Sequence, residues 1–280
     1  MTKIIASIGY NWWAKGGNGF ERAKLIVDEA VTAGVDGICI PLFKAGELYR
    51  DKEQVKAYRH LDRANDWIAD LYEYVKAYKK MFYVSPRFVS DWGAMQDYVD
   101  GYHVVSGDIK YKPLLERLVG EHVLLSTGGA TDEEINEAVE SLLGDLEPAE
   151  SDLVLLHSTG GLPTPSADAQ LRRILDLGTE FYPLYVGLES TFSEPALDFI
   201  AMAFNPEVIM RRLDLGDDAG LETDYSLSPS QMATLVLNSR ALGMAMHPIV
   251  NDEGFTRSDW SSRLNHMRCA EGDYLLPPKG

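Results

Sequence analysis

Cysteine is nearly absent from this sequence, since its 280 residues include only Cys39 and Cys269. Two cysteines cannot build a disulfide framework or a thiolate zinc site, and such scarcity is typical of proteins in a reducing compartment. No window approaches the ~18 consecutive apolar residues of a membrane-spanning helix. The N-terminus, MTKIIASIGYNWW, lacks the pattern of a signal peptide. We therefore expect a soluble, cytoplasmic protein with no membrane partner.

Positive charge is also scarce. The chain has 26 Lys and Arg residues against 43 Asp and Glu residues, which gives a net charge of −17. A surface of this charge repels nucleic acids and anionic membranes at long range, so we expect no nucleic-acid partner. An anionic small molecule would need local basic groups or backbone N–H donors to bind.

The sequence contains no GxGxxG fingerprint after its first apolar run, which a doubly wound dinucleotide-binding sheet would usually carry. It does contain a regular alternation of strand-like runs and amphipathic stretches. Strands are expected at 3–9, 37–43, 81–85, 102–106, 122–126, 152–158, 181–187 and 207–211. Amphipathic helices are expected at 20–34, 131–146 and 229–243, among others. Eight strands, each followed by a helix, predict a single-domain α/β protein, a (β/α)8 TIM barrel over residues 1–243 with an irregular tail over 244–280.

Two successive strands end in small polar clusters, SGD at 106–108 and STGG at 126–129. In a barrel of this type, functional residues gather at the C-terminal ends of the strands. Ser106 and Ser126 are therefore expected on one rim, where hydroxyl groups and glycine amides can bind an anion. The alternative is structural: Asp108 would cap the next helix, and Ser126 would be a turn residue.

Several longer motifs occur in a characteristic order, among them HVVSGDIKYKPLLERL, VLLSTGGATDEEINEAVESL and LVLLHSTGGLPTPSADAQLRRI. Together they resemble the N-acetylneuraminate (sialic acid) synthase family over roughly residues 3–243. The resemblance implies a barrel that condenses phosphoenolpyruvate with an N-acetylated amino sugar and uses a divalent metal. It also implies a small C-terminal antifreeze-like domain, for which the segment 244–280 is too short.

The residues to which the resemblance assigns catalysis are mostly replaced. Ser7 stands in place of the family's acidic residue on the first strand. Cys39 and His103 stand in place of two lysines that hold phosphoenolpyruvate. Gly160 and Leu162 replace an asparagine and a tyrosine that contact the sugar, so we expect a different acceptor.

Both metal-binding histidines implied by the resemblance are also replaced, by Thr191 and Arg212, and Met210 replaces a neighbouring glutamate. Threonine and arginine are poor ligands, and the permanent positive charge of Arg212 would repel a cation. We therefore predict no metal and no other cofactor. Arg212 either binds a ligand anion bidentately or forms an ion pair with Glu189 at the rim.

These considerations give a set of candidate site residues. His103 and Glu189 are candidates for proton transfer, although His103 is also consistent with a satisfied core histidine. The candidates for binding phosphate or substrate are Ser106, Ser126, Thr127, Gly128, His157 and Arg212.

Two functions of different classes remain open. The chain could be a metal-independent condensing enzyme that uses phosphoenolpyruvate and an altered acceptor, and so binds an anionic small molecule at the barrel mouth. Alternatively, it could be a non-catalytic pseudo-synthase that acts in binding or assembly. The loop NWWAKGGNG carries Trp12 and Trp13, which could cover the barrel mouth or pack against a partner subunit. A homodimer stays open.

Overall fold

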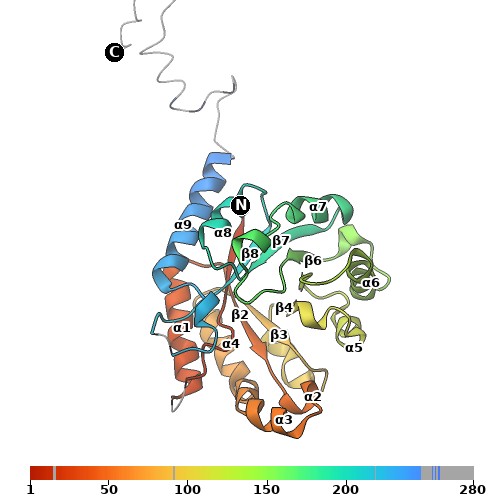
Figure 1. Ribbon diagram of the computed structural model, residues 1–280, viewed down its shortest axis with the longest axis vertical. Helices are drawn as coiled ribbons and strands as arrows, with labels where there is room; N and C mark the ends of the chain where they lie inside the picture. Colours follow the sequence, from red (N-terminus) through yellow and green to blue (C-terminus); the bar gives the residue numbers. More distant parts are fainter. Residues whose placement is uncertain are drawn as a thin grey trace, which may run out of the picture. The chain divides into compact units, whose positions relative to one another are not determined.

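A computed structural model describes residues 1–14, 17–90, 92–217 and 219–246, and the single residues Gly254, Thr256 and Ser258. Eight parallel strands form a closed barrel in chain order, which confirms the expected fold (Figure 1). The strands are β1 (Lys3–Ser7), β2 (Gly37–Leu42), β3 (Met81–Pro86), β4 (Gly101–Val104), β5 (Val123–Ser126), β6 (Leu153–His157), β7 (Tyr185–Ser190) and β8 (Val208–Arg212).

Helices connect the strands on the outside of the barrel. The α-helices are α1 (Gly19–Ala33), α2 (Ala45–Leu48), α3 (Lys52–Tyr58), α4 (Ile68–Ala77), α5 (Lys112–Leu115), α6 (Asp132–Leu143), α7 (Arg173–Glu180), α8 (Ala196–Met202) and α9 (Pro229–Met246). Helix α6 begins with a capping box, because the Thr131 side chain accepts from the Glu134 amide and the Glu134 side chain accepts from the Thr131 amide. These local signals are why the helix begins where the sequence predicted.

The connection between β3 and β4 corrects the expectation that a helix follows every strand. Its described residues form two short 3₁₀ helices, Trp92–Ala94 and Gln96–Tyr98. This segment lacks the repeated apolar spacing of an amphipathic helix, so an α-helix there would have no apolar face to bury.

Strand β7 also differs from the expectation, because it covers Tyr185–Ser190 instead of 181–187. Phe181 caps the end of α7, and Pro183 has no N–H to donate to a strand ladder. The shift matters for the site, since it places Glu189 inside a strand. Strand β4 ends at Val104, so Ser106 begins a 3₁₀ helix, Ser106–Asp108, beyond the strand.

Side chains alternate between the barrel interior and the helix layer. The interior is filled by a cluster of buried side chains that come from six of the strands: Ile5, Cys39, Tyr83, Leu124, Val154, Leu156, Val208 and Met210. On β8, Val208 and Met210 therefore point inward, and Arg212 continues that face.

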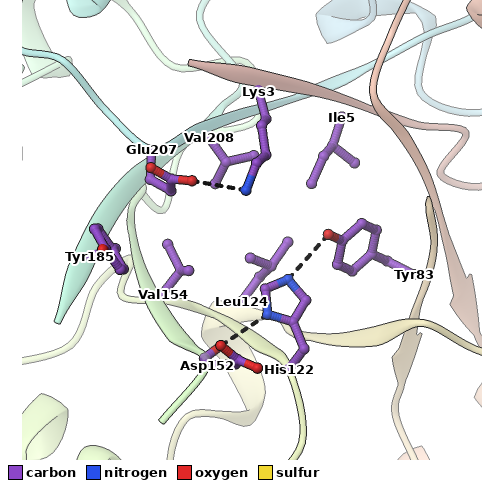
Figure 2. A pocket seen from close by; sticks show the side chains of 10 residues that line it. All are labelled: Lys3, Ile5, Tyr83, His122, Leu124, Asp152, Val154, Tyr185, Glu207 and Val208. Carbon is purple, nitrogen blue, oxygen red and sulfur yellow. Dashed lines mark hydrogen bonds and ion pairs between the residues drawn. The ribbon is translucent and has the colours of Figure 1, made fainter. Parts of the chain in front are cut away.

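A small cavity of about 120 Å³ lies at the N-terminal ends of the strands (Figure 2). Several of its polar side chains are paired with neighbours: Lys3 Nζ lies 2.9 Å from Glu207 Oε1, and the His122 ring lies between the Tyr83 hydroxyl and the Asp152 carbonyl. These contacts, at the end of the barrel opposite the expected site, support a stabilising role.

The chain consists of two compact units, Met1–Ser239 and Arg240–Gly280. Most of the tail expected at 244–280 lies outside the described residues. Among the residues that are described, no helix is long and apolar enough to cross a lipid bilayer.

Replacing Gly187 with alanine should destabilise the barrel. A Cβ atom at this position would lie 2.6 Å from both the Val208 carbonyl oxygen and Val208 Cγ1, and the backbone of β8 cannot move away without breaking its ladder. We expect Gly187→Ala to lower the free energy of unfolding by about 2–3 kcal/mol, as overpacking of a core does.

The matched control is Gly46→Ala in α2, where nothing lies within 4 Å of the added Cβ. It should leave stability unchanged or raise it by up to about 1 kcal/mol. Urea denaturation of both variants measures the difference, and equal stabilities would contradict the close packing of β7 on β8.

Candidate functional site

Charged side chains meet at the C-terminal ends of the strands, where Glu189, Arg212 and Glu222 form ion pairs. A cavity of about 290 Å³ opens there, which we call the mouth cavity. The polar side chains that line it include Tyr10, Arg87, Ser106, Ser158, Glu189, Arg212 and Glu222. The cavity therefore lies where barrels of this type carry their sites.

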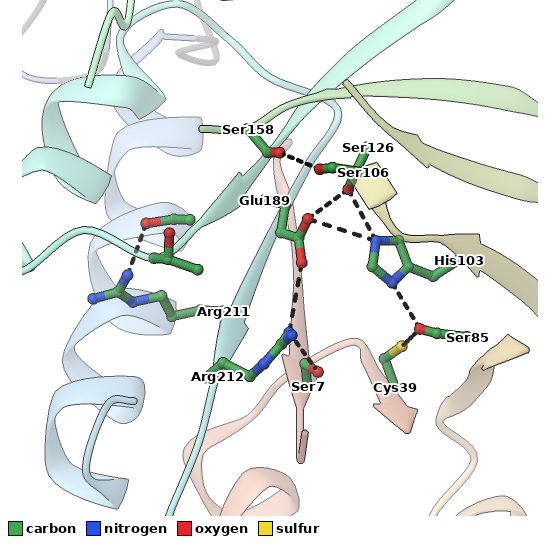
Figure 3. A network of polar contacts seen from close by, with 12 residues as sticks. Ser7, Cys39, Ser85, His103, Ser106, Ser126, Ser158, Glu189, Arg211 and Arg212 are labelled. Carbon is green, nitrogen blue, oxygen red and sulfur yellow. Dashed lines mark hydrogen bonds and ion pairs between the residues drawn. The ribbon is translucent and has the colours of Figure 1, made fainter. Parts of the chain in front are cut away.

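Below the mouth cavity, seven of the eight strands each contribute one polar side chain to a continuous chain of contacts (Figure 3). We call it the polar belt, and its members are Ser7, Cys39, Ser85, His103, Ser126, Glu189 and Arg212. The belt separates the apolar interior of the barrel from the mouth cavity.

Glu189 is at the centre of the polar belt. Ser126 Oγ donates a hydrogen bond of 2.6 Å to Glu189 Oε2. Because the Ser126 proton is used in this bond, its oxygen accepts from His103 Nε2 at 2.9 Å. On the other side, Arg212 Nη1 lies 3.6 Å from Glu189 Oε1. One carboxylate thus lies between an imidazole and a guanidinium.

Each charged side chain of this group shifts the pKa of its neighbour toward the charged form. Burial alone would lower the pKa of His103, but Glu189 raises it to about 9. Burial alone would raise the pKa of Glu189, but His103 and Arg212 lower it to about 2. At neutral pH, His103 is therefore an imidazolium and Glu189 a carboxylate. His103 is almost fully buried and does not line the mouth cavity, so any proton that it supplies must pass through Ser126 or Glu189.

Arg212 points into the barrel, as the alternation along β8 predicted, and forms the ion pair with Glu189 that was one of its two expected roles. It also lies 3.4 Å from Glu222 and donates to Ser7 Oγ at 3.0 Å. Burial would lower the pKa of Arg212, but Glu222 and Glu189 raise it above its ordinary value. The guanidinium is therefore compensated by two carboxylates.

Glu222 was not found by sequence reasoning. It lies in the irregular segment between β8 and α9, where no periodicity indicates which side chains reach the barrel. The Tyr10 amide donates to Glu222 Oε2 at 2.7 Å, and the Tyr225 hydroxyl donates to Oε1 at 2.8 Å. Gly9, at a φ of +50°, makes this approach possible, because a Cβ there would lie 1.8 Å from Glu222 Oε2.

A second part of the mouth cavity, formed after β3, β4 and β6, carries hydroxyl groups and an arginine. Ser106 Oγ lies 2.9 Å from Ser158 Oγ and accepts from the Gly128 amide at 3.2 Å. A side chain on Gly128 would collide with both hydroxyls, at 2.5 and 2.8 Å. Gly128 therefore serves this cluster as a small residue and as an N–H donor.

Arg87 completes this part of the cavity and was also missed by sequence reasoning. It forms a two-point ion pair with Asp108, with Nε 2.9 Å from Oδ2 and Nη2 3.2 Å from Oδ1. A Cβ on Gly107 would lie 3.6 Å from Arg87 Nη2, so the guanidinium is next to the Ser106–Asp108 turn. The run Tyr83, Ser85, Arg87 continues one face of β3, a signal that could have identified it. We call Arg87, Ser106 and Ser158 the arginine–serine wall.

The remaining candidates do not line the mouth cavity. Ser126 is fully buried in the polar belt, and Thr127 and His157 line a neighbouring cavity of about 450 Å³. Leu156 points into the barrel, so His157 faces the helix layer, where its Nε2 donates to the Ala169 carbonyl at 2.9 Å. The structure thus brings Ser106, Gly128, Glu189 and Arg212 to the mouth region and directs His157 elsewhere.

The two tryptophans of the first loop pack within their own chain. Trp12 is buried and meets Trp67 edge-to-face at 5.4 Å, and the Trp13 ring lies 4.7 Å from the ring of His60. Neither residue lines the mouth cavity, so the structure does not support their expected role as a cover for it.

The donors present do not fit the divalent metal that the family resemblance implies. Thr191 Oγ1 donates to the Gly161 carbonyl at 3.0 Å, and Arg212 places a guanidinium beside Glu189 and Glu222. Within the described part of the chain, no three His, Cys, Asp or Glu side chains form a group that could hold a metal ion. A cation at this position would meet a permanent positive charge.

A closed (β/α)8 barrel with a polar mouth defines the class of this protein, and comparison with known proteins gives the family. The model of the NeuB family matches residues 26–250, so the chain belongs to the NeuB family. The resemblance found in the sequence is thereby confirmed.

Known proteins and structures resemble the chain over most of its length. An uncharacterized protein of Methanocaldococcus jannaschii is 29% identical over 249 residues, which cover 85% of this chain and 70% of that protein. The N-acetylneuraminic acid (sialic acid) synthetase of Leptospira borgpetersenii, solved with citrate, has a TM-score of 0.81 and 23% identity, with 94% of this chain and 91% of that chain covered. The spore coat polysaccharide biosynthesis protein SpsE of Bacillus subtilis has a TM-score of 0.72 and 20% identity, over 92% and 74% of the two chains. At these identities, the structural likeness establishes the fold.

The raised pKa of His103 predicts that stability falls with rising pH. The folded protein holds a proton on His103 up to about pH 9, whereas an unfolded histidine releases it near 6.5. The contribution is therefore fully present below pH 6.5 and is lost between pH 6.5 and 9, by an amount on the order of 3 kcal/mol. Glu189, whose pKa is lowered, contributes above its ordinary value of 4.5 and loses this contribution as pH falls toward 2.

Urea denaturation at pH 6, 7.5 and 9.5 measures this loss, and His103→Gln provides the control because it removes the titrating group. The decline between pH 6 and 9.5 should be smaller in the variant than in the wild type. Parallel profiles would show that His103 is not protonated in the folded state.

Proposed function

We propose that the protein binds a small molecule carrying a phosphate or carboxylate group at the arginine–serine wall of the mouth cavity. One observation carries this proposal: Arg87 and the serines Ser106 and Ser158 line one cavity at the C-terminal ends of the strands, in a chain of net charge −17. In so acidic a protein, such a cluster provides the local basic group that an anionic ligand requires.

The donors of Arg87 are sufficient for this role. A guanidinium has five N–H groups, of which Asp108 engages two. The Tyr10 hydroxyl lies beside the guanidinium as well, and the remaining donors can serve a ligand. Ser106 and Ser158 share one hydrogen bond, so one of the two hydroxyl groups keeps a proton that it can donate to the same oxyanion.

Membership of the NeuB family supports an enzymatic version of this proposal. In that version, the ligand is a phosphorylated keto-acid precursor such as phosphoenolpyruvate, and the acceptor differs from the family's usual sugar because Gly160 and Leu162 offer no polar side chains. No step uses a metal. Glu189 is ionised and lines the cavity, so its role would be to accept hydrogen bonds or to stabilise a developing positive charge.

One specific observation favours the second version, a non-catalytic binding protein. Arg212 is held between Glu189 and Glu222, and the Thr191 hydroxyl is bonded to a backbone carbonyl. Neither group is arranged as a metal ligand or as a proton donor to a substrate. Both versions share the anion-binding wall, so binding is the function that the site supports best.

Removing the guanidinium of Arg87 should weaken anion binding. We expect Arg87→Gln to weaken the binding of inorganic phosphate, phosphoenolpyruvate and citrate at least tenfold in isothermal titration calorimetry. Arg173→Gln is the matched control, because its side chain is 25% exposed against 27% for Arg87 and is likewise ion-paired, with Asp132, but lines the neighbouring cavity. If the wild type binds none of these anions, or if both variants lose affinity equally, the proposal is wrong.

The enzymatic version has a separate test. Phosphate release from phosphoenolpyruvate is measured across a panel of sugars and sugar derivatives, in EDTA and in manganese. Because Arg212 and Thr191 do not fit a metal, we expect any release to be the same in both media. Release that requires manganese would show that the inherited metal chemistry survives.

A further inference from the structure

The side chains that the sequence suggested for anion binding contact a carboxylate of the protein itself, that of Glu189. Ser126 and Arg212 were expected to bind a ligand anion, and His103 was expected in place of a lysine that holds one. All three contact Glu189, at 2.6, 3.6 and 3.7 Å respectively (Figure 3). Hydroxyl, guanidinium and imidazolium are the donors that a phosphate or carboxylate ligand would use.

The Glu189 carboxylate occupies the position between these three groups. The side chain extends from β7 across the barrel toward β4 and β5 on one side and β8 on the other, as Figure 3 shows. The residue is 9% exposed and lines the floor of the mouth cavity. A ligand that enters the cavity therefore meets a carboxylate where it would otherwise meet the guanidinium of Arg212, the imidazole of His103 and a hydroxyl group.

A second carboxylate, that of Glu222, lies on the other side of Arg212. Glu222 lies 3.4 Å from Arg212 Nε and is itself held by the Tyr10 amide and the Tyr225 hydroxyl. Its backbone is fixed by the buried Asn11, whose Oδ1 accepts from the Glu222 amide at 2.8 Å. Arg212 thus faces two carboxylates, and a ligand anion placed beside it would be repelled by both.

We propose that Glu189 is an internal anion that occupies a binding site formed by Ser126, His103 and Arg212, and that it thereby directs the anionic group of a ligand to the arginine–serine wall. Glu189 is then a specificity-determining residue of the mouth cavity. The statement that Glu189 directs a ligand to the arginine–serine wall rests on the proposed function. The statement that Glu189 occupies an anion site does not, because the wild-type side chain itself fills that site.

The proposal predicts that a small carboxylate can bind in the site once the Glu189 carboxylate is removed. Glu189→Ala removes the carboxylate and its volume, and leaves His103 and Arg212 facing a space of carboxylate size. We expect formate and acetate to bind the Glu189→Ala variant saturably and at least tenfold more tightly than the wild type. Because binding to the folded state stabilises it, both anions should also raise the melting temperature of the variant.

Two controls distinguish an anion site from a merely structural ion pair, and one further variant guards against misfolding. Glu189→Gln removes the charge but keeps the volume, so it should gain no affinity for formate. Acetamide has the shape of acetate without its charge and should not stabilise Glu189→Ala. If Glu189→Ala does not fold, Glu189→Ser leaves similar space with a small polar group and is tested in the same way.

The outcomes separate the two proposals. Formate binding by Glu189→Ala that persists in the double variant Glu189→Ala/Arg87→Gln supports the internal-anion site independently of the arginine–serine wall. If the wild type binds no phosphate, phosphoenolpyruvate or citrate but Glu189→Ala binds formate, the proposed function fails and the internal-anion site stands. If folded Glu189→Ala and Glu189→Ser show no saturable, anion-specific stabilisation, or if acetamide stabilises them equally, the inference is overturned.

Discussion

The contact between Glu189 and its two cationic neighbours, His103 and Arg212, is the interaction on which the mouth of this barrel depends. A buried carboxylate without partners would be costly, and so would either cation alone. Together they form a compensated group that can lie beneath an open cavity without drawing water into the apolar interior. The lowered pKa of Glu189 and the raised pKa of His103 are two expressions of this one contact.

This group also determines what the mouth cavity can offer to a ligand. Arg212 is engaged by Glu189 and Glu222 and contributes little net positive charge to the cavity. Arg87, which is paired with one carboxylate and retains further N–H donors, is the basic group best placed to meet an anion. The protein has thus kept the fold of the NeuB family while its own acidic side chains compensate the charge at one side of the mouth.

Much of the fold could be predicted from the sequence, because strand and helix periodicities are local. The capping box at Thr131 and the glycine after α1 determine where these helices begin and end, whatever lies around them. The predicted position of β7 was wrong for a local reason as well. The segment FYPLYVG is apolar throughout, and only Pro183 indicates that the strand begins later. The displacement matters because it moves Glu189 from the residues after a strand into the strand itself.

The candidate site was predictable only in part. The sequence by itself determined a (β/α)8 barrel of the NeuB family and the positions of Ser106, His103 and Arg212 on or just beyond their strands, because spacing and motifs are properties of the chain. Only the tertiary structure decided which partners these groups have. Glu222 reaches Arg212 through an irregular segment, and Arg87 forms its ion pair with Asp108, which follows a different strand, so both contacts depend on how the barrel closes. Charge compensation is a property of distances in space, and a linear sequence does not contain those distances.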